Sequence, residues 1–258
     1  MIRKFKEIET WGTVIVLEAF SDSHVKLDKS FEECEKFLQK VDEIFSTFRA
    51  DSQISKLRKG EIKLPECDAG LQEIWFTSEK LKSQTNGAFD PWSVKGGVDF
   101  SGIVKGWAAD KCCRILKSHQ IDNCLINAAG DISVRGARYT EGEVKPWRIG
   151  IRDPRDLQNQ NQILKEFELK DCAIATSGTY ERAHIIDPYT NLIAIGSLSA
   201  TVVGPVGAVC EALATALIVV GEPGIAWFKQ PEFLEYFAWV IDREGKFTYS
   251  TKESDLNI

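Results

Sequence analysis

The chain has 258 residues, of which 43% are hydrophobic and 27% charged, as in ordinary globular proteins. Its net charge of −6 and the absence of a block of basic residues disfavour nonspecific binding to nucleic acid. No apolar stretch is long enough to cross a membrane, and the first residues contain no hydrophobic targeting segment. We therefore expect a cytoplasmic protein without a membrane anchor.

The seven cysteines are odd in number and show no Cys-x-x-Cys spacing. Most of them stand among apolar residues, as small hydrophobic side chains do. This pattern predicts reduced, largely buried thiols rather than a disulfide framework or a zinc site.

The first half of the chain predicts a strand and three helices. The apolar run Thr13–Ala19 indicates a buried strand. Apolar residues at helical spacing predict a long helix from an N-cap at Ser30 to Phe48, followed by a polar turn over residues 49–57. A second helix is expected over Leu71–Gln84, and a third from an N-cap at Ser101 to about Ser118.

The second half is richer in strands, with one apolar helix over Gly207–Val220. Strands are predicted at Cys124–Ala128, Trp147–Ile151, Ile163–Leu169, Ala173–Thr176, His184–Asp187, Thr201–Val203, Phe237–Ile241 and Phe247–Ser250. Helices mixed with hairpin-like strand pairs favour an α+β fold with a largely antiparallel sheet, rather than a doubly wound parallel one.

The stretch Ala175–Pro188 concentrates groups suited to chemistry at a phosphoryl group. It contains the hydroxyl side chains of Thr176 and Ser177, and His184, a residue type that titrates near neutral pH. The alternative is a hydrogen-bonded structural histidine next to a turn that begins at Asp187.

The segment Asp99–Gly106 opens the third predicted helix. Unpaired N–H groups at a helix start attract anions, Lys105 is near enough to reach a phosphate, and Asp99 suits a ribose or ring N–H. An ordinary capped helix with a surface lysine is the other interpretation.

Two more groups suit a nucleotide ligand. Glu211 and Thr215 are four residues apart and share a helix face, and both supply oxygen ligands for Mg²⁺. The alternative is the polar edge of an amphipathic helix. Phe89 and Asp90 suit stacking on, and bonding to, a planar ring, or they simply belong to a turn.

Taken together and in chain order, these segments resemble the FAD:protein FMN transferase family, also called ApbE. The matching segments are Trp11–Thr13, Phe48–Leu57, Gly87–Pro91, Asp99–Gly106, Asn127–Asp131, Ala175–Gly178, His184–Pro188 and Cys210–Ala216. The sequence departs from the family pattern at four places: Trp11 replaces a methionine, Ser101 and Ala129 replace glycines, and Glu211 replaces the metal-binding aspartate.

The resemblance implies a single flavin transferase domain over residues 1–258, with a T-fold-related α+β architecture and an FAD cleft between subdomains. It implies that, with Mg²⁺, FMN moves from FAD to a threonine or serine hydroxyl of a target flavoprotein through a phosphoester bond, and that AMP leaves. It assigns His184 as the general base.

The remaining roles are implied by the same motifs. The metal ligands are Glu211, Thr215 and a backbone carbonyl near Gly102. The FAD site comprises Ala88, Phe89, Asp90, Asp99, Lys105 and Ile185, with Thr176 and Ser177 near the phosphates or the metal. Two other functions stay open at this point: a Mg²⁺-dependent FAD pyrophosphatase that yields FMN and AMP, and a flavin-binding protein without catalytic activity.

Overall fold

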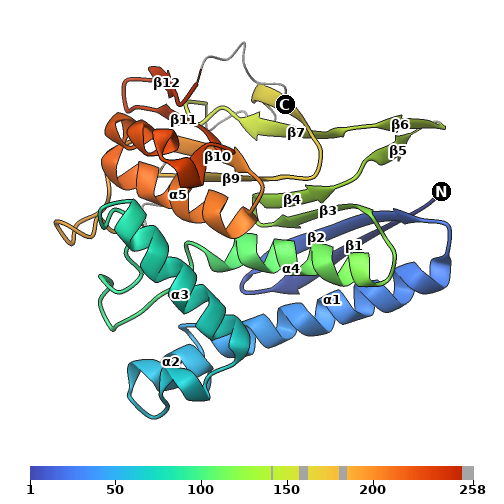
Figure 1. The fold of residues 1–258 in the computed structure, drawn as a ribbon, viewed down its shortest axis with the longest axis horizontal. Helices are drawn as coiled ribbons and strands as arrows, with labels where there is room; N and C mark the ends of the chain where they lie inside the picture. The colour runs from blue at the N-terminus through green and yellow to red at the C-terminus, as the bar shows by residue number, and fades with distance from the viewer. Residues whose placement is uncertain (141, 157–161, 180–184, 252–258) are drawn as a thin grey trace.

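The fold is built around one eight-stranded sheet. The computed structural model describes residues 1–140, 142–156, 162–179 and 185–251. Strands follow the order β1-β2-β3-β4-β9-β10-β11-β12, and each neighbouring pair is antiparallel (Figure 1). The predicted α+β class with a largely antiparallel sheet is confirmed.

Twelve strands occur in the described part of the chain. Their bounds are β1 Ile2–Thr10, β2 Thr13–Ser21, β3 Asn123–Ala128, β4 Asp131–Arg135, β5 Arg138–Thr140, β6 Glu143–Lys145, β7 Trp147–Arg152, β8 Ile163–Leu169, β9 Ala173–Gly178, β10 Ser199–Gly204, β11 Phe237–Ile241 and β12 Phe247–Tyr249. Strands β5 and β6 form one separate two-stranded ribbon, and β7 and β8 form another.

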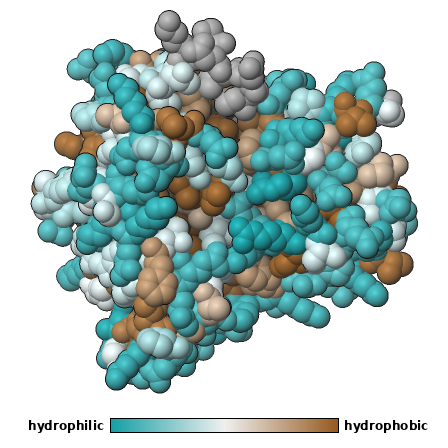
Figure 2. Space-filling model, viewed as in Figure 1, coloured by the Kyte–Doolittle hydropathy of each residue, from teal (hydrophilic) through white to brown (hydrophobic). Residues whose placement is uncertain are grey.

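The helices gather on one side of the large sheet (Figure 1). They are α1 His24–Phe45, α2 Gln53–Arg58, α3 Ala69–Gln84, α4 Val104–Ser118 and α5 Gly207–Val220, with 3-10 turns at Leu64–Glu66, Glu222–Lys229 and Pro231–Phe233. In the same view, apolar residues show along α3, where Phe76 is 59% exposed (Figure 2).

Two apolar clusters hold these layers together. The larger joins α1, α4 and α5 to the sheet through side chains such as Leu38, Leu116 and Leu213. The smaller joins the sheet to β7 and β8, where the rings of Phe167 and Trp239 stack with centroids 5.1 Å apart. Strands β10 and β11 are therefore buried on both faces.

Two predicted N-caps and one predicted turn are wrong. Helix α1 begins at His24 with Ser23 as its N-cap; Ser30 is inside the helix, where its hydroxyl donates to the Leu27 carbonyl. The turn predicted over residues 49–57 contains α2, because Ser52 accepts from the Ser55 N–H and starts a helix. Helix α4 begins at Val104 without a side-chain cap, so Ser101 is not its N-cap.

The strand predicted at His184–Asp187 is wrong for its described part, because Ile186 makes only an isolated bridge to Ile193. His184 itself lies outside the described residues. Strand β1 was not predicted: more than half of its residues are charged, and it forms one edge of the sheet. Strands β4, β5 and β6 were not predicted either. Among the helices of the described ranges, none has the length and apolar character that a bilayer crossing requires.

Candidate active site

A cavity of about 750 Å³ opens where the helices meet the centre of the sheet. It collects every predicted site residue within the described ranges: Ala88, Phe89, Asp90, Asp99, Gly102, Lys105, Thr176, Ser177, Ile185, Glu211 and Thr215. These residues come from the turn after α3, the start of α4, the end of β9, the loop after it and α5. The predicted base His184 is outside the described residues, but Ile185, the next residue, lines the cavity.

The close approach of α4 and α5 sets the geometry of the cavity floor. A Cβ atom on Gly106 would lie 2.2 Å from the Gly207 carbonyl oxygen, so only glycine permits this contact. The buried Asp110 fixes the start of α5, because its Oδ2 accepts from the Gly207 N–H at 2.7 Å. Its Oδ1 accepts from the Ser133 hydroxyl, which ties both helices to β4.

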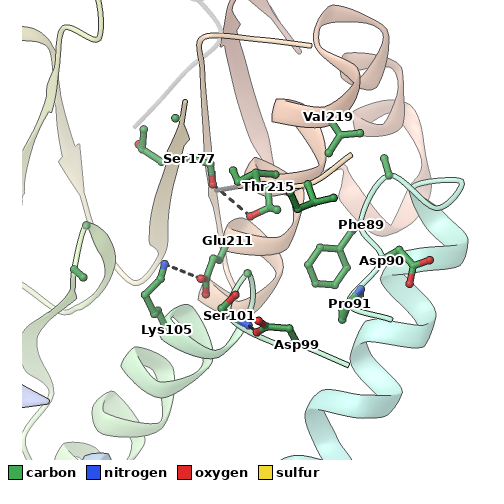
Figure 3. A pocket seen from close by; sticks show the side chains of 18 of the residues that line it. Phe89, Asp90, Pro91, Asp99, Ser101, Lys105, Ser177, Glu211, Thr215 and Val219 are labelled. Atoms are coloured by element: carbon green, nitrogen blue, oxygen red, sulfur yellow. Dashed lines mark hydrogen bonds and ion pairs between the residues drawn. The ribbon is translucent and has the colours of Figure 1, made fainter. Parts of the chain in front are cut away.

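This approach brings together a cluster of three charged groups: the buried carboxylates Asp131 and Glu211 and the partly exposed Lys105. The Lys105 Nζ lies 2.7 Å from Glu211 Oε1 and also pairs with the Asp131 carboxylate. Glu211 Oε2 accepts from the Gly106 N–H at 2.8 Å. Figure 3 shows Lys105 and Glu211 pointing toward one another from α4 and α5. The Glu211 side chain is 2% exposed, whereas that of Lys105 is 33% exposed.

Burial and charge set the protonation of this cluster. Burial alone would lower the pKa of Lys105, but attraction to Asp131 and Glu211 outweighs it and raises that pKa, so the ammonium stays charged. Burial raises the pKa of Glu211 to about 7, against the opposing pull of Lys105. The pKa of Asp131 is raised for the same reason. Two carboxylates facing one ammonium leave one unbalanced negative charge when both are ionised.

The cluster changes part of the sequence-based picture. The Gly106 N–H at the start of α4 is not free to bind an anion, because the Glu211 carboxylate already accepts its hydrogen bond. Sequence reasoning placed Asp131 only in a matching motif and gave it no role. No local signal identifies its partner, because Lys105 is distant in sequence and meets Asp131 only through the packing of α4 on β4.

The residues present fit a divalent cation in charge and ligand type. The buried Oε1 of Glu211 faces Lys105 without the geometry of a hydrogen bond. Thr215 Oγ1 lies 3.4 Å from Ser177 Oγ, and a Cβ on Gly102 would lie 3.3 Å from Thr215 Oγ1. Within the described ranges no group of three His, Cys, Asp or Glu residues could hold a metal. A divalent cation held here would take most of its ligands from hydroxyl and carbonyl oxygens.

The opposite wall carries the residues predicted to hold the flavin. Phe89 and Pro91 border the cavity from the turn after α3 (Figure 3). The carboxylate of Asp90 is already engaged, because it pairs with Lys82 at 2.7 Å and accepts from the Trp92 N–H at 3.0 Å. Asp90 therefore holds the shape of this turn.

Asp99 is bound by its own loop. Its Oδ1 accepts from the Ser101 N–H at 2.9 Å, and its Oδ2 lies 3.8 Å from the Arg58 guanidinium. On the sheet side, Thr176 and Thr201 share a hydrogen bond of 2.9 Å across β9 and β10. These contacts hold the loop around Asp99 and the sheet side of the cavity wall in place.

A large cavity with a few converging polar groups and perturbed carboxyl pKa values is typical of an enzyme site. The family profile described as the ApbE family matches residues 11–95 and 92–238. The chain belongs to the ApbE family.

Curated relatives of this chain are named FAD:protein FMN transferase. That of Treponema pallidum is 33% identical over 48% of this chain and 38% of the relative, and that of Escherichia coli K12 is 32% identical over 61% and 43%. The matched part thus spans less than half of each of these two relatives. The Vibrio cholerae relative is 26% identical over 83% of this chain and 80% of its own length.

Solved structures share the fold. The flavin transferase ApbE from Vibrio cholerae superposes with a TM-score of 0.82 at 23% identity, covering 98% of both chains. The ApbE protein from Thermotoga maritima gives a TM-score of 0.81 at 21% identity, covering 96% of this chain and 97% of the other.

Proposed function

We propose that the chain is a Mg²⁺-dependent FAD:protein FMN transferase. FAD is its first substrate, and the second is a flavoprotein that offers a threonine or serine hydroxyl. The names of the relatives support this activity, and the collected motif residues support its location in the cavity. A cytoplasmic location stays a prediction.

The observation that carries the proposal is the Lys105–Asp131–Glu211 cluster at the cavity floor. When both carboxylates are ionised, its excess negative charge lies beside two hydroxyl groups, Thr215 and Ser177, and its own lysine is partly exposed and lines the cavity. A binding protein for an uncharged ring has no need of such a cluster, since burying charges costs free energy. Acting on a pyrophosphate requires both a cation site and a positive side chain.

In the proposed reaction, the acceptor hydroxyl oxygen forms a bond to the phosphorus of the FMN half. The bond from that phosphorus to the bridging oxygen breaks, and AMP leaves with the electron pair. His184 takes the hydroxyl proton as general base. Its sequence neighbour Ile185 lines the cavity, which supports this role.

Lys105 stabilises the negative charge that develops on the phosphate oxygens, because its ammonium stays protonated and its partly exposed side chain lines the cavity. Glu211, Thr215 and a carbonyl near Gly102 are the groups that would hold Mg²⁺. When bound there, the metal neutralises charge on the pyrophosphate. Phe89, Ala88 and Ile185 supply the apolar wall for the flavin ring, while Asp90 and Asp99 hold the loops of that wall in place.

The test is a pair of reactions with FAD and Mg²⁺, with and without an acceptor flavoprotein. We expect AMP to appear in step with FMN attached to the acceptor, and little AMP without it. AMP release that does not depend on the acceptor would instead identify an FAD pyrophosphatase. FAD binding without AMP in either reaction would identify a non-catalytic flavin-binding protein.

Substitution of the base gives a second test. His184→Ala is expected to bind FAD normally and to lose transfer by roughly 10²–10⁴-fold. His119→Ala is the matched control, because His119 pairs with Glu33 on the surface, away from the cavity. An unchanged transfer rate in His184→Ala removes this histidine as the base.

A further inference from the structure

The loop between β9 and β10 exposes an unusual run of apolar side chains. Residues 185–195 contain one charged residue, Asp187, in a chain that is 27% charged. Four side chains, which we call the apolar rim, point largely to solvent: Tyr189 is 57%, Leu192 68%, Ile193 49% and Ile195 66% exposed. Monomeric proteins seldom expose contiguous large apolar groups without a binding role.

The described part of this loop is held by specific hydrogen bonds. Asp187 accepts from the Tyr189 N–H and the Thr190 hydroxyl, both at 2.8 Å. The Ala194 N–H donates to the Ile185 carbonyl at 2.9 Å, and the Tyr189 hydroxyl donates to the Asn86 carbonyl at 3.0 Å after α3. The apolar rim is thus presented on an ordered support, which lowers the entropy cost of binding.

The same loop forms part of the cavity wall. Ile185, Ile186 and Pro188 line the cavity, while the rim residues that follow them face outward. In Figure 1 the loop projects from the body of the protein beside the upper end of α3. One short segment therefore joins the interior of the site to an exposed apolar surface.

We propose that the apolar rim binds the apolar side chains that flank the acceptor hydroxyl in the target protein. This inference rests on the proposed function, because a protein hydroxyl must then enter a cavity that this loop borders. The occupant that fits is an extended, uncharged segment with aliphatic side chains next to its threonine or serine. A second copy of this chain is a poorer fit, because it would cover the loop that borders the cavity into which the target must reach.

The test uses two synthetic peptides of about 15 residues, each with one central threonine. One has leucine and valine on both sides of the threonine, and the other has serine at those positions. Binding of each fluorescently labelled peptide is measured by anisotropy on the FAD-loaded protein. FMN attachment is measured separately by mass spectrometry with Mg²⁺.

Three proteins are compared: wild type, the rim variant Leu192→Ser/Ile195→Ser, and the control Val25→Ser/Val144→Ser. The control residues are 61% and 63% exposed but belong to α1 and β6, at the other end of the molecule (Figure 1). We expect wild type and control to bind the aliphatic peptide at least about 10-fold more tightly than the serine peptide. The rim variant should lose this preference while retaining its affinity for FAD.

The inference is overturned if wild type binds the two peptides equally or not at all, or if the preference survives in the rim variant. A rim-dependent preference without FMN attachment would support the docking surface while contradicting the transferase function. If the rim variant alone changes the protein from dimer to monomer in sedimentation and the peptide preference is absent, the rim is a contact between copies and the inference is wrong.

Discussion

The two ends of the cavity break the usual rule of burial in opposite directions. At the floor, Lys105, Asp131 and Glu211 bring charges into the interior. At the mouth, by which we mean the loop that borders the cavity with Ile185 and Pro188, Leu192 and Ile195 expose aliphatic side chains to water. Burying charge costs free energy unless partners compensate, and exposing apolar surface forgoes stabilisation. The floor therefore indicates chemistry, whereas the mouth indicates recognition of a partner.

The largest effect is expected at the floor. Glu211→Gln removes one charge with little change in shape, and should reduce FAD turnover at saturating Mg²⁺ by roughly 10²–10³-fold. Glu222→Gln is the control, because Glu222 is an exposed glutamate. Steady-state AMP release measures both. Turnover of Glu211→Gln equal to wild type would show that the charged floor does not serve catalysis.

The second largest effect is expected from a change in the spacing between α4 and α5 at the cavity floor. Gly106→Ala would place a Cβ 2.2 Å from the Gly207 carbonyl and push α4 away from α5. We expect a loss of about 1–3 kcal/mol in the free energy of unfolding, measured by urea denaturation. Gly102→Ala is the matched control, since its nearest neighbour would lie at 3.3 Å. Equal stability of the two variants contradicts the close-packed floor.

The pH dependence of the free energy of unfolding tests the burial of Glu211 at the cavity floor. The pKa of Glu211 is about 7 in the folded chain and near ~4.3 when unfolded. The folded state therefore holds an extra proton between these values, and its free energy of unfolding falls as pH rises through that range. We expect wild type to lose about 1–3 kcal/mol more than Glu211→Gln between about pH 4.5 and pH 7. The free energy of unfolding of both proteins is measured by urea denaturation at several pH values. If it changes with pH by the same amount in both proteins, the raised pKa of Glu211 is contradicted.

The smallest effect on stability is expected at the mouth. The rim variant Leu192→Ser/Ile195→Ser should change the free energy of unfolding by at most about 0.5 kcal/mol per residue, because both side chains are exposed. Thermal and urea unfolding of the free protein check this. A loss of several kcal/mol would mean that the rim packs within the protein and is not a binding surface.

Local patterns in the sequence predicted much of the fold. Strand Ile163–Leu169 and helix Gly207–Val220 have the predicted bounds, because apolar runs between clear breaks leave little choice. Strand β1 escaped prediction because its lysines and glutamates suit a sheet edge rather than a buried strand. A serine before an apolar run predicts a cap at Ser30, and only the packing of α1 shows that this serine is buried inside the helix.

The sequence predicted the site residues that belong to recognisable motifs. It did not predict the contacts that form between segments distant in the chain. Glu211 and Thr215 follow from helical spacing, and both line the cavity. The pairing of Asp131 with Lys105 and the engagement of Asp90 by Lys82 depend on the tertiary fold. The exposure of Leu192 and Ile195 is likewise hidden in a sequence, where apolar residues are normally expected inside.

The central claim is that this chain transfers FMN to a protein hydroxyl. Mass spectrometry of candidate flavoproteins co-expressed with the wild-type chain tests it most directly, with the His184→Ala chain as the negative control. The account predicts FMN on a threonine or serine of a target with the wild-type chain and its loss with the variant. Flavoproteins that remain unmodified with the wild-type chain, while purified chain and FAD release AMP without any acceptor, would contradict it.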